Sequence, residues 1–174
     1  MIGLPTQKKI CLIGSFAVGK TNLVSRYVHG VFNDIYLTTR GVKVENRLTV
    51  ADEERISLVI WDIHGEDAFQ KINRTYLRGS SALLFVADGT RPGTLDKVLS
   101  LRRETMELVE GNLPSALAIN KVDLKDDWEI SEGMLRTVRE QDWNVAETSA
   151  KSGQSVSAIF DQLVEQMSER EQVV

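Results

Sequence analysis

Apolar and polar positions recur along this chain with two different periods, which divide it into strand-like and helix-like segments. Two runs, ALLFVAD at 82–88 and SALAIN at 115–120, are almost continuously apolar, as in strands that are buried on both faces of a parallel sheet. The strand-like segments are 8–13, 42–50, 56–62, 82–88, 115–120 and 144–148, and helical spacing occurs at 19–29, 66–78, 93–110, 130–141 and 154–169.

The order of these segments predicts the fold class. Strands alternate with helices along most of the chain, which favours one α/β domain over residues 1–174, with a doubly wound, mostly parallel, six-stranded sheet and helices on both faces. The segment at 42–50 alternates apolar with polar residues and is followed closely by 56–62, so this pair predicts an antiparallel hairpin. Ligands of such sheets bind beyond the carboxyl ends of the strands.

The composition fits one domain with a sizeable core, since 42% of the 174 residues are hydrophobic. The net charge of −4 carries no basic excess that would indicate nucleic acid or an anionic membrane. One cysteine excludes an internal disulfide and agrees with a reducing cytosol. The chain shows no apolar stretch of spanning length, no signal peptide and no terminal prenylation cysteine. We therefore expect a cytoplasmic protein without a direct membrane anchor.

Residues 14–21, GSFAVGKT, carry the phosphate-binding pattern Gly-x-x-x-x-Gly-Lys-Thr between a predicted strand and a predicted helix. The two glycines let backbone N–H groups approach a polyphosphate closely, and the helix N-terminus that follows favours an anion. Lys20 brings a positive charge to the phosphates, and the hydroxyl of Thr21 suits Mg²⁺. The predicted cofactor-binding residues of this region are Gly14, Ala17, Val18, Gly19, Lys20, Thr21 and Asn22.

Two further motifs follow later strands. In WDIHGED (61–67), Asp62 stands at a strand end where its carboxylate can hold Mg²⁺, and the N–H of Gly65 can bind a γ-phosphate. In NKVD (120–123), Asp123 can accept two hydrogen bonds from guanine. Adenine offers no such pair of donors, so a buried aspartate at this position rejects it.

Neighbouring residues complete the expected base site. Asn120 can tie the loops together, and the stem of Lys121 can cover the ring of the base. In ETSAK (147–151), small residues let the backbone approach the base, with the N–H of Ala150 as the expected donor to the guanine carbonyl. Taken alone, NKVD could instead form a turn with a solvated charge pair. The predicted cofactor-binding residues of these two motifs are Asn120, Lys121, Asp123, Ser149, Ala150 and Lys151.

The order GSFAVGKT, TTRG, WDIHGED, NKVD and ETSAK resembles that of the small GTPases of the Ras superfamily, with spacing similar to the Rab-like branch and its bacterial relatives. The resemblance covers residues 8–168 and implies a switch that binds GTP or GDP with Mg²⁺. It implies a switch I at 32–41 and a switch II at 64–77, which order on GTP and relax on GDP. Effector, exchange-factor and activating proteins would bind through these segments. The implied metal ligands are Thr21, Thr39 and Asp62.

The resemblance also assigns roles to single residues. Phe32 matches the aromatic residue that packs on the edge of guanine, with an ordinary core phenylalanine as the alternative. Tyr36 matches the switch I aromatic that covers the phosphates, with a surface tyrosine as the alternative. The implied catalytic set is Lys20, Thr39, Gly65 and Glu66.

Four residues depart from the family pattern near the γ-phosphate. Glu66 replaces the glutamine that orients the attacking water, and an ionised carboxylate accepts hydrogen bonds without donating any. Phe16 replaces a glycine where an activating protein's arginine enters, so it could block that approach or simply pack on switch II. His64 could crowd its loop or bind a phosphate, and Arg40 on the effector surface suggests an acidic partner. Each could also be a structural or solvated residue.

Three interpretations follow from these departures. The first is a regulatory switch that hydrolyses GTP slowly. The second is an interaction module that signals by nucleotide occupancy and hardly hydrolyses. The third, a scaffold held in the GDP state, follows if His64 prevents switch II from closing. In each case we expect a monomer or a hetero-complex that binds no nucleic acid.

Overall fold

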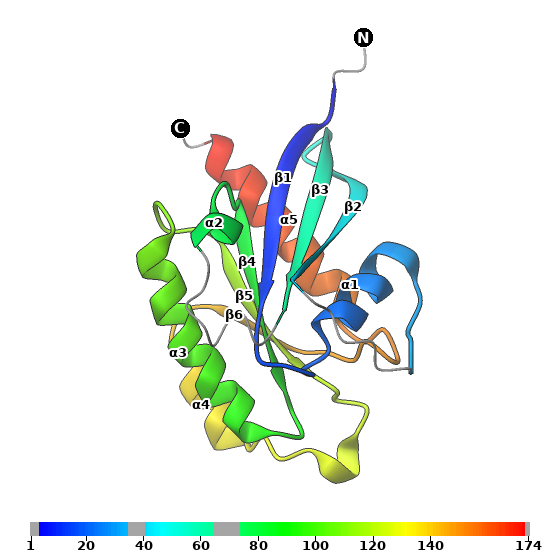
Figure 1. Ribbon diagram of the computed structural model, residues 1–174, viewed down its shortest axis with the longest axis vertical. Helices are drawn as coiled ribbons and strands as arrows, with labels where there is room; N and C mark the ends of the chain where they lie inside the picture. Colours follow the sequence, from blue (N-terminus) through cyan, green and yellow to red (C-terminus); the bar gives the residue numbers. More distant parts are fainter. Residues whose placement is uncertain (1–3, 35–40, 65–73, 173–174) are drawn as a thin grey trace.

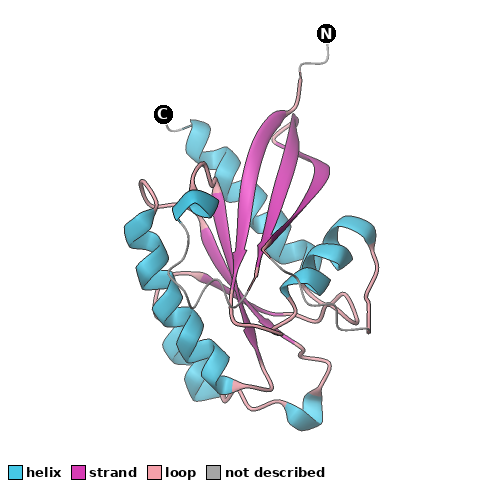
Figure 2. Ribbon diagram, viewed as in Figure 1, coloured by secondary structure: helices cyan, strands magenta, loops and turns pink. Residues whose placement is uncertain are grey.

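A computed structural model of the chain describes residues 4–34, 41–64 and 74–172 (Figures 1 and 2). Its strands and helices follow one another in the alternating order that the sequence predicts. The elements are β1 (Thr6–Ile13), α1 (Lys20–His29), β2 (Val42–Ala51), β3 (Glu54–Ile63), α2 (Arg74–Leu77), β4 (Ala82–Asp88), α3 (Pro92–Leu108), β5 (Ser115–Asn120), the short 3₁₀ turn η1 (Lys125–Asp127), α4 (Glu132–Arg139), β6 (Asn144–Glu147) and α5 (Val156–Gln172).

Within the described residues, the strands form one six-stranded sheet in the order β2-β3-β1-β4-β5-β6. Every neighbouring pair is parallel except β2 and β3, which form the antiparallel hairpin at one edge. The predicted fold class is therefore confirmed. Because β1, β4 and β5 are central and parallel, their carboxyl ends open at the same edge of the sheet.

Two hydrophobic layers cover the two faces of the sheet. Ile10 and Leu12 of β1 belong to the layer that also contains apolar side chains of α1 and α5. The alternate residues Cys11 and Ile13 belong to the opposite layer, with apolar side chains of α3 and α4. Figure 1 shows α3 and α4 on the opposite side of the sheet from α1. A strand covered on both faces must be apolar at every position, which explains the continuous apolar runs.

Element boundaries differ from the predicted ones at several places. The hairpin pairs up to Ala51 and Glu54 because Asp52 and Glu53 form a two-residue turn with φ of 49° and 66°. Helix α4 is shorter than 130–141 because Ser131 caps it and accepts a hydrogen bond of 3.2 Å from the backbone of Met134. The other bounds differ by a few residues, and of the predicted helix 66–78 the part at 66–73 lies outside the described residues.

The loop after β4 passes close beneath an aromatic ring. A Cβ atom added to Gly89 would lie 1.8 Å from the ring of Trp128, which packs over this glycine. Gly89 also donates to the carbonyl of Asn120 over 2.9 Å and accepts from the backbone of Glu129 over 2.9 Å. The loops after β4 and β5 are therefore held together at the edge where the strands end.

This packing predicts opposite effects at two glycines. Gly89→Ala should lower the free energy of unfolding by about 1–3 kcal/mol, because Trp128 must be displaced. Gly93→Ala, in the first turn of α3 with open space around the added methyl group, should leave stability unchanged or raise it by up to about 1 kcal/mol. Urea unfolding of both variants checks this, and equal effects would contradict the role of the ring.

Candidate nucleotide-binding site

The loop GSFAVGKT joins the carboxyl end of β1 to the start of α1, as predicted. Gly14 passes so close to β4 that an added Cβ would lie 2.3 Å from the carbonyl oxygen of Val86. Gly19 has a φ of 99°, and its Cβ would lie 2.3 Å from the side chain of Asn120. Ala17 also has a positive φ, of 59°. Both glycines are therefore required by backbone geometry, which leaves the loop tightly curved at the start of the helix.

Lys20 lies at the centre of this curved loop. Its ammonium group donates to the carbonyl oxygens of Gly14 and Ser15, each over 2.9 Å, and only 6% of the residue is exposed. Burial lowers the pKa of Lys20 to about 8, partly offset by the nearby carboxylate of Asp62. A buried cation of this kind is a strong attractor for an anion, because little solvent screens it.

The carboxylate of Asp62 stands at the end of β3 and faces the start of α1. Its Oδ2 accepts a hydrogen bond from the hydroxyl of Thr21. Its other oxygen, Oδ1, is buried and has no hydrogen-bond partner among the described residues. Burial raises the pKa of Asp62, opposed by Thr21 and Lys20. A hydroxyl beside a buried, incompletely paired carboxylate suits a hard divalent cation such as Mg²⁺. Thr39, the third predicted ligand, lies outside the described residues.

A pocket of about 310 Å³ lies next to the loop. Side chains from the loop, from the segment after α1 and from both base motifs line it, as the sequence predicts for a nucleotide. The lining residues are Ala17, Gly19, Asn22, Phe32, Asn33, Asp34, Asn120, Lys121, Asp123, Leu124, Ala150 and Lys151. Phe32 lines the pocket and also packs against the core layer that contains apolar side chains of α1.

Asn120 fixes three segments around this pocket. Its Nδ2 donates to the carbonyl of Val18 over 3.0 Å. Its Oδ1 accepts from the hydroxyl of Thr148 and from the backbone N–H of Ala150, each over 3.2 Å. The N–H of Ala150 is thus engaged with a side chain here, and its donation to guanine stays a prediction. Asp123 accepts a hydrogen bond of 2.6 Å from the hydroxyl of Ser149, which orients its carboxylate.

Arg26 and Asp88 are among the residues that hold this site together and that sequence reasoning missed. Arg26 of α1 donates to the carbonyls of Ala150 and Lys151 over 2.8 and 2.5 Å, and no motif signals it. Asp88 ends β4 with its side chain fully buried. Its position at the end of an apolar run, at the same sheet edge as Asp62, is a signal that could have identified it.

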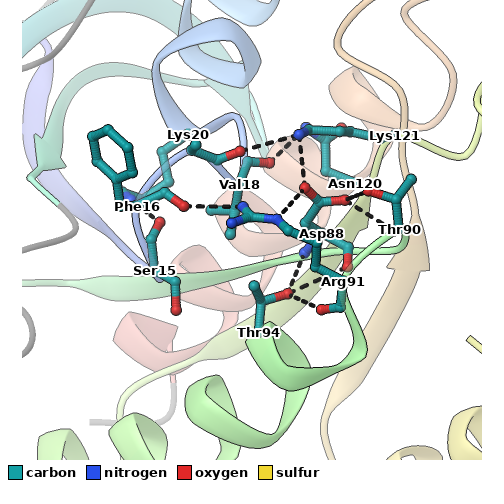
Figure 3. Close-up of polar contacts among 11 residues, drawn as sticks. Ser15, Phe16, Val18, Lys20, Asp88, Thr90, Arg91, Thr94, Asn120 and Lys121 are labelled. Atoms are coloured by element: carbon teal, nitrogen blue, oxygen red, sulfur yellow. Dashed lines mark hydrogen bonds and ion pairs between the residues drawn. The ribbon is translucent and has the colours of Figure 1, made fainter. Parts of the chain in front are cut away.

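Asp88 is the most heavily hydrogen-bonded carboxylate of the site (Figure 3). Its Oδ2 pairs with the ammonium of Lys121 at 2.7 Å and with the guanidinium of Arg91 at 2.9 Å. Its Oδ1 accepts from the backbone and hydroxyl of Thr90 over 2.9 and 2.7 Å. Burial opposes ionisation of Asp88, but the donors, led by Lys121, outweigh it and hold the pKa below its usual value.

Phe16 of the phosphate loop and His64, which directly follows β3, contact each other through their rings. Their ring centroids lie 6.0 Å apart in an edge-on arrangement. Phe16 is 36% exposed, whereas His64 is 8% exposed and its backbone N–H donates to the carbonyl of Gly41 over 2.9 Å. This geometry places Phe16 against the start of the predicted switch II. The predicted residues Tyr36, Thr39, Arg40, Gly65 and Glu66 lie outside the described part of the chain.

Comparison with known proteins agrees with this geometry. A model of the Ras family matches residues 9–169. The chain is 29% identical to the Ras-related protein Rab-7b of Mus musculus over 158 residues, which cover 89% of this chain and 79% of that protein. It is 30% identical to the Ras-related protein Rab-13 of Canis lupus familiaris over 156 residues, with 89% and 77% coverage.

The chain therefore belongs to the Ras family. Its similarity to Rab proteins identifies it as a Rab-like small GTPase, and membership in this family supports a GTP-binding switch. Among the described residues, no helix combines the length and the apolar character needed to cross a membrane.

The buried charge of Asp88 predicts a change in acid stability. Its folded pKa is lowered, so its contribution is complete above the unfolded value of about 4 and is lost as the pH falls through the folded value. Asp88→Asn should lower the free energy of unfolding at pH 7 by about 1–3 kcal/mol. The difference from wild type should stay constant from pH 7 to about 5 and narrow as the pH falls below about 4.

Urea unfolding across that pH range measures this effect. Asp96→Asn, which removes an exposed aspartate of α3, is the matched control and should follow the wild-type curve. If the free energy of unfolding of Asp88→Asn differed from that of wild type by the same amount at every pH, the assignment of a lowered pKa to Asp88 would be wrong.

Proposed function

We propose that this chain is a guanine-nucleotide switch that binds GTP and GDP with Mg²⁺ and hydrolyses GTP slowly. One observation carries the proposal: the phosphate loop and the segment Asn120–Asp123 are hydrogen-bonded to each other, and both line the pocket of about 310 Å³. A phosphate cradle and a base-reading aspartate are therefore held at a fixed separation, as a nucleotide requires.

The base end of the site favours guanine. The carboxylate of Asp123 lines the pocket and is oriented by the Ser149 hydroxyl. Guanine presents a ring N–H and an amino group side by side, which can donate to the two oxygens of one carboxylate. Adenine would leave that charge without a donor, at a cost that discriminates strongly between the two bases.

The phosphate end stabilises negative charge. Lys20 supplies a buried ammonium group, and the N–H groups of the loop and the first turn of α1 supply further donors. Thr21 and Asp62 would hold Mg²⁺, which when bound supplies charge neutralisation on the phosphates. Hydrolysis would proceed by in-line attack of water on the γ-phosphate, with Lys20 and these N–H groups stabilising the charge that develops.

Slow hydrolysis follows from Glu66. An amide at this position could accept a hydrogen bond from the attacking water and donate one to the transferred group. An ionised carboxylate can only accept, and it would face the phosphates with a like charge. The exchange factors, activating proteins and effectors of this switch would act through residues 32–41 and 64–77, at a cytoplasmic location.

The second candidate function is an occupancy-signalling module that scarcely hydrolyses GTP. The contact between Phe16 and His64 favours it, because the family pattern implies that an activating arginine would enter at the position of Phe16, and His64 packs against that ring. The two candidates bind the same nucleotides and differ in turnover.

Asp123→Asn tests the base assignment. Xanthine carries a carbonyl where guanine carries its amino group, so an amide can donate where the carboxylate accepts. We expect the variant to lose GDP affinity by at least about 100-fold and to bind XDP more tightly than wild type does. Asp126→Asn, an exposed residue of the same loop, should keep the wild-type preference. Retained guanine preference in Asp123→Asn would show that another group reads the base.

Glu66→Gln tests the cause of slow turnover. We expect single-turnover hydrolysis of bound GTP with Mg²⁺ to accelerate on the order of tenfold, because the amide can donate to the transition state. Glu107→Gln, on the exposed face of α3, should leave the rate unchanged. A rate that stays equal or falls in Glu66→Gln would exclude this explanation, and GTP that never turns over in either protein would favour the occupancy-signalling module.

A further inference from the structure

Three successive carbonyl groups of the phosphate loop are each held by a side chain from elsewhere in the chain (Figure 3). The carbonyl of Val18 accepts from Asn120 over 3.0 Å, and that of Ala17 accepts from Lys121 over 3.1 Å. The carbonyl of Phe16 accepts from Nη2 of Arg91 over 3.0 Å. The outer side of the loop is therefore anchored at three consecutive peptide groups.

These anchors determine where the N–H groups of the loop point. In a trans peptide the carbonyl and the following N–H point in opposite directions, and the described chain contains no cis peptide bond. A carbonyl held on the outer side therefore turns the next N–H to the inner side. The three anchored carbonyls orient the N–H groups of Ala17, Val18 and Gly19 in this way.

Arg91 differs from the other two anchors in its origin. Asn120 and Lys121 belong to the base motif, whereas Arg91 lies in the turn between β4 and α3 and belongs to none of the sequence motifs. Its guanidinium uses Nε to pair with Asp88 at 2.9 Å and Nη2 to reach the Phe16 carbonyl. The planar group makes both contacts from one rigid fork, which an ammonium group reproduces poorly.

The carboxylate of Asp88 fixes the direction of this fork. Asp88 is itself held by Thr90 and Lys121, so its position does not depend on Arg91. The side chain of Arg91 is 44% exposed, and thus it contributes little apolar burial to the core. Asp88 is buried and already ordered, and it directs the half-exposed Arg91 onto the carbonyl of Phe16. This arrangement indicates that Arg91 has a role in the geometry of the loop.

We propose that Arg91 is a positioning residue for the polyphosphate, acting through the peptide between Phe16 and Ala17. By holding the Phe16 carbonyl outward, it keeps the N–H of Ala17 turned toward the bound phosphates. The inference rests on the proposed function, because it concerns the same nucleotide site. It adds a group outside the predicted motifs that controls how tightly the phosphate end is held.

Arg91→Ala tests this role directly. Without the anchor, the peptide after Phe16 can rotate, and one donor to the phosphates is lost for part of the time. We expect a fluorescent GDP analogue to dissociate about three- to tenfold faster from the variant, the range for one charge-assisted hydrogen bond at a half-exposed site. Arg103→Ala, which removes an exposed arginine of α3, is the matched control and should release the analogue at the wild-type rate.

Two further measurements separate loop positioning from a general loss of structure. The preference for GDP over XDP should be unchanged in Arg91→Ala, because Asp123, Ser149 and the pairing of Lys121 with Asp88 do not involve the mutated side chain. In ¹⁵N-correlated spectra of the GDP complex, the amide signal of Ala17 should shift in Arg91→Ala and stay in place in Arg103→Ala.

The outcomes are distinct. Equal dissociation rates in wild type, Arg91→Ala and Arg103→Ala, or an unmoved Ala17 signal, would overturn the role of Arg91 while leaving the proposed function intact. Faster release together with a lost preference for GDP over XDP would mean a general disruption of the site and would also overturn it. A wild-type protein that bound no guanine nucleotide would overturn the proposed function, and this inference would fall with it.

Discussion

The side-chain amide of Asn120 joins three segments that lie far apart in the sequence, and the nucleotide site depends on it. One end of the amide donates to the phosphate loop at Val18, and the other end accepts from Thr148 and Ala150. Asn120 is itself 2% exposed at the end of β5. A buried amide must satisfy both its donor and its acceptor. Here the partners belong to the phosphate loop and to the segment after β6, so satisfying the amide also sets the spacing between these two segments.

The charged side chains around this amide form two groups, which differ in how completely the charges are paired. Lys121 and Arg91 share the carboxylate of Asp88, which remains ionised despite full burial of its side chain. Lys20 and Asp62 are less completely compensated. Burial lowers the pKa of the lysine and raises that of the aspartate, and one oxygen of Asp62 has no partner among the described residues. The fully paired group around Asp88 supports the loop. The incompletely paired Lys20 and Asp62 suit the binding of phosphate and a cation.

Phe16 and His64 link the phosphate loop to the predicted switch segments. Phe16 stands at the third position of the phosphate loop and packs edge-on against His64. His64 in turn is tied through its backbone to Gly41, so the ends of the two predicted switch segments are linked here. The carbonyl of Phe16 accepts a hydrogen bond from Arg91, while the ring of Phe16 packs against His64. One loop residue therefore connects the start of α3 with the start of the predicted switch II.

The sequence by itself determined the fold class, and it named most of the residues that line the pocket beside the phosphate loop. Continuous apolar runs required strands covered on both faces, and the glycine pattern of the loop required a curved backbone before a helix. Motifs at strand ends had to meet at one sheet edge, because parallel strands share a direction.

Tertiary structure decided what local patterns cannot encode. Asp88, Arg26 and Arg91 each have a partner on a distant segment, namely Lys121, Ala150 and Phe16. The local sequence around an arginine or an aspartate does not specify such a partner. Packing also decided that Trp128 covers Gly89 and that Ala150 donates to Asn120. Such contacts depend on the separation between loops, which only the folded sheet sets.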